Sequence, residues 1–106
     1  MTQALDDSNV VEMIQNGKCV VMLTADFSGP CNLVRDFYEN VARRKGNQIS
    51  FYTFDLDGNT KFPQTIGAKA IPLFAFFEDG ELQQTLVGAV GEDILLDKLE
   101  EIYHDN

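Results

Sequence analysis

The sequence predicts an α/β fold in which a central mixed β-sheet is flanked by helices and followed by a C-terminal β-hairpin and helix. Three observations support this. Helix and strand patterns alternate through the first part of the chain, an Asp79-Gly80 turn joins two strand-like runs, and an amphipathic helix pattern comes last. Alternating elements before an antiparallel hairpin favour a mixed sheet with helices on both faces. With 106 residues, 44% hydrophobic and 24% charged, a single domain over residues 1–106 is predicted.

The first half of the chain is predicted to alternate strands and helices. A short strand near Gln3–Leu5 precedes a helix around Val10–Ile14, which has a polar residue before it and Gly17 after it. Cys19–Leu23 is an uninterrupted apolar run, as expected for a central, parallel strand buried on both faces. A second helix is predicted to begin at Ser28-Gly29-Pro30-Cys31 and to end at the basic run 43–45.

The second half supplies the rest of the sheet. Ile49–Leu56 is rich in aromatic and β-branched residues and predicts a buried strand, which ends at the polar turn 57–59. A short helix is predicted over Lys61–Ile66. Leu73–Phe77 and Leu82–Val87 are predicted to form a hairpin through the Asp79-Gly80 turn. The last helix carries its apolar side chains at Ile94, Leu95, Leu99, Ile102 and Tyr103.

The charge balance excludes some classes of partner. Seventeen acidic and eight basic residues give a net charge of −9 and a pI near 4.3, which disfavours nucleic acids and anionic membrane surfaces as partners. No apolar run reaches the ~18–20 residues of a membrane-spanning helix, and Met1–Asp7 lacks the features of a signal peptide, so a cytoplasmic location is expected. His104 is the only histidine, and neither a metal site nor a cofactor is predicted.

Three separated motifs carry a resemblance to a known family. A buried strand leads into Gly29-Pro30-Cys31, Ile71-Pro72 precedes the predicted hairpin, and Val87-Gly88-Ala89 ends it. Together they resemble the thioredoxin family, over nearly the whole chain and without a gap from Val21 to Ala89. The resemblance implies a thioredoxin fold, a cis bond at Ile71-Pro72, thiol–disulfide exchange with client proteins and, for a dithiol protein, a thioredoxin reductase as partner.

The residues that carry the family's redox chemistry are largely replaced. The resemblance places Ser28 at the position of the nucleophilic cysteine and Cys31 at that of the resolving cysteine. It places Met22 at the family's buried aspartate and Thr53 at the lysine that pairs with this aspartate, while Thr24 stands where the family usually has a tryptophan. The catalytic positions are therefore Ser28 and Cys31, without the family's proton relay.

The positions that bind substrate in the family keep the expected residue types. By the resemblance, an extended client segment lies against the loop before the cis-proline, the Gly-Pro of the active site and a small Gly-Ala loop. The corresponding residues are Phe27, Gly29, Pro30, Ile71, Pro72, Val87, Gly88 and Ala89.

The chemistry of the two thiols and of Ser28 restricts what this site does. A serine hydroxyl neither attacks a disulfide sulfur nor releases a mixed disulfide, so Ser28 is interpreted as a helix N-cap. Cys19 lies about seven residues upstream on a strand, more than about 20 Å from the site, whereas a disulfide needs Cα atoms within about 7 Å. Cys19 is therefore predicted to be a core residue. Cys31 is either a reactive monothiol or an inert buried thiol.

Three functional hypotheses remain open. The first is a thioredoxin-like protein that binds extended protein segments and whose dithiol reductase activity is lost or weak. The second is an ordinary thioredoxin disulfide reductase, active in redox homeostasis, in which Ser28 is an engineered replacement for cysteine. The third is a subunit that assembles through the apolar groove, for which an exposed apolar cluster at Phe27, Pro30 and Ile71 is predicted; the chain is expected to be a monomer or a weak homodimer through that groove.

Overall fold

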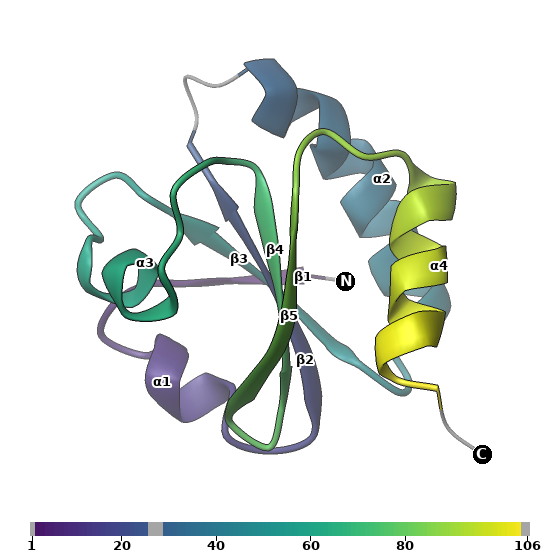
Figure 1. Cartoon of the computed structure of the whole chain (residues 1–106), viewed down its shortest axis with the longest axis horizontal. Helices are drawn as coiled ribbons and strands as arrows, with labels where there is room; N and C mark the ends of the chain where they lie inside the picture. Colours follow the sequence, from purple (N-terminus) through teal and green to yellow (C-terminus); the bar gives the residue numbers. More distant parts are fainter. Residues whose placement is uncertain (1, 26–28, 105–106) are drawn as a thin grey trace.

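The computed structural model describes residues 2–25 and 29–104. The described strands form one sheet and are β1 (Thr2–Leu5), β2 (Lys18–Thr24), β3 (Ser50–Asp55), β4 (Leu73–Glu78) and β5 (Glu81–Val87). Their order across the sheet is β1-β3-β2-β4-β5 (Figure 1). Both β1 and β2 run parallel to β3, whereas β4 runs antiparallel to β2 and β5 antiparallel to β4. The sheet is therefore mixed, as predicted.

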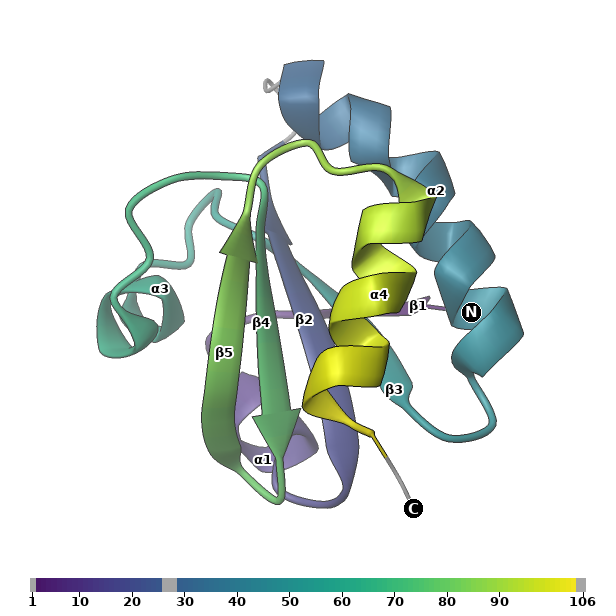
Figure 2. The same cartoon turned by 45° about the vertical axis from the view of Figure 1, so that its right-hand side comes forward.

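Helices cover both faces of this sheet. The described helices are α1 (Val10–Met13), α2 (Gly29–Lys45), α3 (Lys61–Ile66) and α4 (Glu92–Ile102). Figure 2 shows α2 and α4 side by side on one face, while α1 and α3 lie on the other. None of the described helices combines the length and the apolar character that crossing a bilayer requires.

Strand β2 occupies the middle of the sheet, as its apolar sequence predicts. Its side chains from Cys19 to Thr24 are all buried. Alternate residues belong to different cores: Val20 and Met22 pack under α2 and α4, and Val21 and Leu23 pack against the α1 and α3 side. A strand with helices on both faces needs apolar side chains in both directions, which is why the run is continuous and does not alternate.

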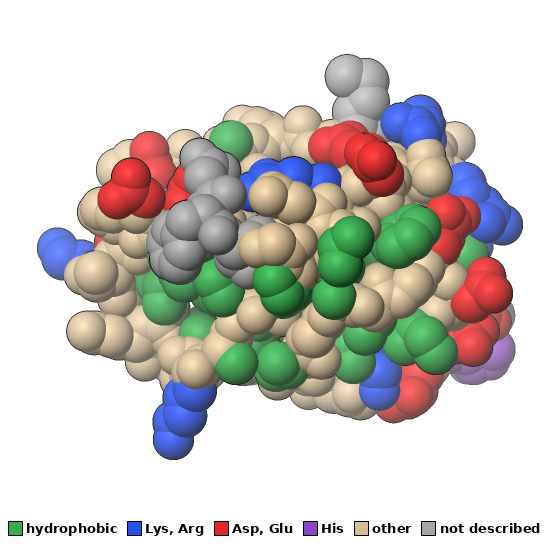
Figure 3. All heavy atoms as spheres, turned by 90° about the horizontal axis from the view of Figure 1, so that it is seen from above, with side chains coloured by type: hydrophobic (Ala, Val, Ile, Leu, Met, Phe, Trp, Pro, Cys, Tyr) green, Lys and Arg blue, Asp and Glu red, His purple; other side chains and the backbone are tan. Residues whose placement is uncertain are grey.

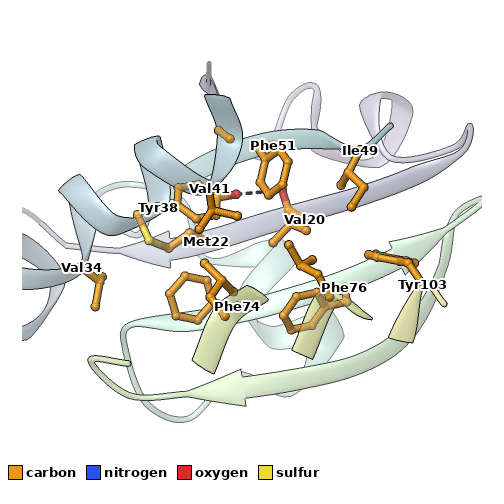
Figure 4. Close-up of a cluster of buried hydrophobic side chains, with 13 residues drawn as sticks. Val20, Met22, Val34, Tyr38, Val41, Ile49, Phe51, Phe74, Phe76 and Tyr103 are labelled. Carbon is orange, nitrogen blue, oxygen red and sulfur yellow. Dashed lines mark hydrogen bonds between the residues drawn. The ribbon is translucent and has the colours of Figure 1, made fainter. Parts of the chain in front are cut away.

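Tyr38 fastens α2 to the centre of the sheet. Its hydroxyl donates to the carbonyl oxygens of Val20 at 3.1 Å and Tyr52 at 2.6 Å; the dashed line in Figure 4 marks the contact with Val20. Burial raises the pKa of Tyr38 well above its usual value, although the bond to the Tyr52 carbonyl acts in the opposite direction. The hydroxyl therefore stays protonated and remains a donor that ties β2 and β3 to the helix.

Replacing Tyr38 by phenylalanine is expected to lower the free energy of unfolding by about 1–3 kcal/mol, because buried carbonyl oxygens lose a donor. Tyr52→Phe is the matched control, since the hydroxyl of Tyr52 reaches its acceptor, the Met13 carbonyl, only at 3.5 Å. Urea unfolding of both variants measures the difference. Equal losses in the two variants would show that the Tyr38 hydroxyl does not anchor α2.

Helix α3 is fixed by the loop that follows β1. The carboxylate of Asp7 accepts hydrogen bonds from the backbone N–H groups of Lys61 and Phe62, each at 2.9 Å. Partial desolvation alone would raise the pKa of Asp7, but these backbone donors outweigh it and the pKa lies below its usual value. The ionised carboxylate thus serves as the cap of α3, because the side chain of its own N-cap residue, Thr60, forms no capping hydrogen bond. This cap holds the helix that leads into the segment before β4.

Candidate functional site

Several chain segments meet at one end of the sheet. Leu73, the first residue of β4, lies between Leu23 on β2 and Val87 on β5. The end of β2 leads towards α2 at the same end, at the top of Figure 1. The backbone N–H of Gly88 donates to the carbonyl of Pro72 at 2.9 Å. The start of α2, the segment before β4 and the end of β5 are therefore gathered at one edge of the fold, although they lie far apart in the sequence.

Two of the predicted site positions, Phe27 and Ser28, lie outside the described residues. The assignment of Ser28 as a helix N-cap and the place of Phe27 in the docking surface therefore stay predictions. The described part of α2 begins at Gly29, and both Gly29 and Pro30 are exposed.

Cys31 lies in the first turn of α2, and its side chain is fully buried at 0% exposure. Cys19 is equally buried but lies near the opposite end of β2, where it pairs with Phe77 and Ser50. The two cysteines are not joined in a disulfide. Burial, with a smaller contribution from the Asp79 carboxylate, raises the pKa of the Cys19 thiol. Cys19 is accordingly a core residue, and the Cys31 sulfur is shielded from an incoming disulfide in this conformation.

Met22 and Thr53 are neighbours across the sheet. They are register partners on β2 and β3, so their side chains point to the same face. Met22 is 1% exposed and packs in the core that also contains Val34, Tyr38 and Phe74 (Figure 4). Met22, which the resemblance places at the position of the family's buried aspartate, is thus a neutral side chain in an apolar core. Among the described residues of this core, only tyrosines carry a titratable proton, and burial raises their pKa values.

The peptide bond between Ile71 and Pro72 is cis. Pro72 is buried, whereas Ile71 is half-buried and packs against the core on the α1 and α3 side. Within the described residues, neither the N–H nor the C=O of Ile71 forms a hydrogen bond. Because both backbone groups of Ile71 lack a partner there, they are able to form hydrogen bonds with an added extended segment.

The loop after β5 forms the other side of this edge. Val87 is 51% exposed, and Ala89 is also exposed. Gly88 has a φ of +115°, a conformation that side chains rarely allow. Figure 3 looks onto this end of the molecule and shows hydrophobic side chains gathered in a band across it, with most charged side chains towards the rim. The exposed Leu33 and Phe37 of α2 add to the apolar surface of the molecule.

A hollow that the sequence does not predict lies beside Ile71. It has a volume of about 200 Å³ and is lined by Leu56, Pro63, Ala68, Lys69, Ala70 and Ile71. These residues are Leu56, which directly follows β3, Pro63 of α3, and residues 68–71 of the segment before β4. The run of small residues around Lys69 was the available signal, but the hollow depends on how three distant segments pack. No cluster of potential metal ligands is present among the residues described.

The thioredoxin family model matches residues 1–101 of the sequence. The chain belongs to the thioredoxin family. It is 29% identical to a thioredoxin of Malassezia sympodialis over 90 residues, which cover 82% of this chain and 86% of that protein. It is 25% identical to a thioredoxin of Listeria monocytogenes over 88 residues, covering 83% of this chain and 85% of that one.

Plant relatives in the same family are longer. A chloroplast M-type thioredoxin of Spinacia oleracea is 27% identical over 100 residues, which are 92% of this chain and 55% of the spinach protein. The chain thus spans just over half of that relative. A crystal structure of Malassezia sympodialis thioredoxin superposes with a TM-score of 0.87 at 24% identity, covering 95% of this chain and 92% of that one. The thioredoxin fold predicted from the motifs is therefore confirmed.

Proposed function

We propose that this thioredoxin-like protein binds extended segments of client proteins at the Ile71–Pro72 edge, with dithiol reductase activity lost or weak. The observation that carries the proposal is the backbone of Ile71, which forms no hydrogen bond within the described residues. It lies beside a buried Pro72 whose carbonyl is held by Gly88. An added strand would gain main-chain hydrogen bonds there and bury the apolar surface around Ile71.

The absence of a second active-site thiol supports weak or absent turnover. Disulfide reduction by a dithiol needs one thiolate to attack and a second to release the mixed disulfide. Ser28 supplies no sulfur, and the Cys31 side chain is buried. Any exchange at Cys31 would stop at a mixed disulfide until another thiol released it. Noncovalent binding of a client segment at the Ile71–Pro72 edge is therefore the function that the site supports best.

The test is binding of an extended peptide without cysteine, measured by fluorescence anisotropy. Ile71→Asp should weaken binding about tenfold or more, because it places a carboxylate against an apolar segment and removes the burial of Ile71. Cys31→Ser should leave the affinity nearly unchanged. Ile94→Asp is the matched control. Ile94 is exposed on α4, so this substitution introduces the same carboxylate at a position away from the Ile71–Pro72 edge.

The affinity for an uncharged peptide is expected to be modest, because the interface is small and the peptide must be ordered. It should also respond weakly to salt, since the predicted docking residues carry no charge. The covalent alternative is tested with the same peptide carrying one disulfide-linked cysteine. If that peptide is captured, and Cys31→Ser abolishes its capture while Ile71→Asp does not, recognition is covalent and a monothiol function replaces the proposed one.

An ordinary reductase with an engineered Ser28 is the second candidate, and the thioredoxins among its relatives favour it. In that case a thioredoxin reductase would be the partner that supplies electrons. An engineered Ser28 does not explain why Met22 and Thr53 stand where the resemblance places the family's aspartate and lysine. These two further differences favour the first candidate, a protein that binds client segments. For that candidate we propose a single domain, a cytoplasmic location and a monomeric state, or a weak homodimer through the groove.

A further inference from the structure

Two turns are joined at the end of the sheet opposite the Ile71–Pro72 edge (Figure 1). The loop between α1 and β2 contains Asn16 and Gly17, and the turn between β4 and β5 contains Asp79. The N–H of Gly17 donates to the Asp79 carboxylate at 2.8 Å, and the N–H of Asp79 donates to the Gly17 carbonyl at 2.9 Å. We call this reciprocal pair of hydrogen bonds the Gly17–Asp79 clasp.

The two turns also approach each other closely. A Cβ on Gly80 would lie 2.8 Å from the Oε1 atom of Gln15, so the β4–β5 turn packs directly against the loop. Gly17 has a φ of +75°, a conformation that glycine adopts without strain. The backbone nitrogen of Gly17 is therefore held in a defined place by a charged acceptor, although Asn16 and Gly17 are exposed to solvent.

Asn16 and Gly17 form the only Asn-Gly pair in the chain. An asparagine deamidates when the backbone nitrogen of the next residue attacks the carbon of the side-chain amide. The new C–N bond closes a succinimide ring, the bond to the side-chain nitrogen breaks, and this nitrogen leaves as ammonia with the proton of the backbone amide. Water then opens the ring to aspartate or isoaspartate. Glycine hinders the ring closure least, because it has no Cβ.

The clasp acts on the nitrogen that attacks. The N–H of Gly17 must give up its charge-assisted hydrogen bond to Asp79 before its nitrogen reaches the Asn16 side chain. Ring closure therefore requires the clasp to open, and local opening of an exposed turn needs less free energy than unfolding of the domain. We propose that Asn16 is a site of spontaneous deamidation and that the Gly17–Asp79 clasp sets its rate in the folded protein.

The products disfavour the clasp. Either product adds a carboxylate at position 16, next to the residue that binds Asp79, and like charges repel each other. Isoaspartate also lengthens the main chain by one carbon. The modification is therefore a one-way change that loosens the α1–β2 loop from the β4–β5 turn. It is independent of client binding, because the clasp lies at the other end of the sheet from Ile71 and Pro72.

The test follows the tryptic peptide 1–18 by mass spectrometry while the protein is incubated at neutral pH. Deamidation raises the peptide mass by about one dalton, and fragment spectra separate Asn16 from Asn9, the other asparagine of this peptide. Asn16 should deamidate in the folded protein at least about tenfold more slowly than in a synthetic peptide of residues 1–18, which has no clasp. Asn47 is exposed but is followed by Gln48, and it should stay unmodified over the same period.

The carboxylate of the clasp is removed by Asp79→Gly, which still permits the φ of +51° at this position. This variant should deamidate at Asn16 about tenfold faster than the unsubstituted protein, because the N–H of Gly17 loses its charged acceptor. Glu81→Gln is the matched control: it removes a carboxylate from the same hairpin, at the start of β5, and should leave the rate unchanged. Asp79→Asn serves if Asp79→Gly fails to fold. It keeps a neutral acceptor and should give an intermediate rate, and its new Asn-Gly pair lies in a different tryptic peptide.

Tyr38→Phe separates local opening from global unfolding. It lowers the stability of the domain without touching the clasp, so the rate at Asn16 should not change. A rise equal to that of Asp79→Gly would show that global unfolding limits the reaction, and the proposal would be wrong. It would also be wrong if Asp79→Gly and Glu81→Gln had the same rate. If Asn16 stays intact in both the unsubstituted protein and Asp79→Gly after the synthetic peptide is fully converted, Asn16 is not a deamidation site.

Discussion

Replacing Ser28 by cysteine is expected to convert a protein without sustained disulfide turnover into one that reduces protein disulfides over many cycles. The unsubstituted chain has one thiol at the site, Cys31, and a single thiol cannot both attack a disulfide and release the mixed disulfide. The substitution creates a Cys-Gly-Pro-Cys segment in which the second thiol completes the reaction. Insulin reduction with a dithiol reductant, followed for several turnovers per protein, measures the gain.

The recovered activity should stay below that of an ordinary thioredoxin. Proton transfer by a positioned group typically contributes about 10²–10⁴-fold to a rate, and the neutral Met22 supplies no such group. Ser28→Cys combined with Cys31→Ser is the control and should return turnover to the background of the reductant alone. Sustained turnover by the unsubstituted protein above that background would contradict the proposed loss of reductase activity.

The second large effect concerns stability: Met22→Asp is expected to lower the free energy of unfolding at neutral pH by more than about 3 kcal/mol. Met22 is 1% exposed and is surrounded by apolar side chains. The substitution removes a well-packed side chain and places a carboxylate where Thr53 offers no positive charge. Met22→Leu, which nearly conserves volume, is the control and should cost less than about 1.5 kcal/mol.

The loss in Met22→Asp should depend on pH. Burial raises the pKa of a carboxyl in the folded state above its unfolded value of about 3.9. Between these two values the folded state binds more protons than the unfolded state, so stability falls as pH rises and then reaches a plateau above the folded pKa. Urea unfolding from pH 4 to 8 measures this slope relative to Met22→Leu. A slope equal to that of Met22→Leu would show that the carboxylate escapes the core.

The register of the sheet supplies a test for rescue. Because Met22 and Thr53 are cross-strand partners on β2 and β3, adding Thr53→Lys to Met22→Asp places an ammonium group beside the new carboxylate. The double variant should recover part of the lost stability at neutral pH, and the recovery should vanish at pH 4, where the carboxyl is largely protonated. Such a coupling energy is the expected signature of neighbouring charged groups.

The order of helices and strands was predictable from local patterns. The apolar run 19–23 predicts a strand with helices on both faces, and β2 is buried from Cys19 to Thr24 in the middle of the sheet. Asp79 and Gly80 both have positive φ, the conformation that a tight hairpin turn requires. These features depend on neighbours in the chain, so sequence periodicity and turn chemistry predict them well.

The candidate site was predictable only through its three motifs. The backbone segments of the site were predicted from Gly29-Pro30, Ile71-Pro72 and Val87-Gly88-Ala89. The serine at position 28, where the family has its nucleophilic cysteine, predicted the loss of dithiol chemistry. Whether Cys31 is exposed depends on how the first turn of α2 packs against the core, and the structure places it at 0% exposure. Burial results from contacts between distant segments, which local spacing does not report.

By itself the sequence determined the alternation of elements, the central strand, the hairpin turn and the substitutions at Ser28, Met22 and Thr53, because residue identity and short-range periodicity carry that information. Only the tertiary structure decided that Met22 and Thr53 are register partners, that Asp7 caps a helix more than fifty positions away, and that Lys69 lies at the rim of an apolar hollow. These relations arise when strands pair and segments close over one another. The residues that meet in this way are determined by the packing of the whole sheet, and no local sequence pattern specifies them.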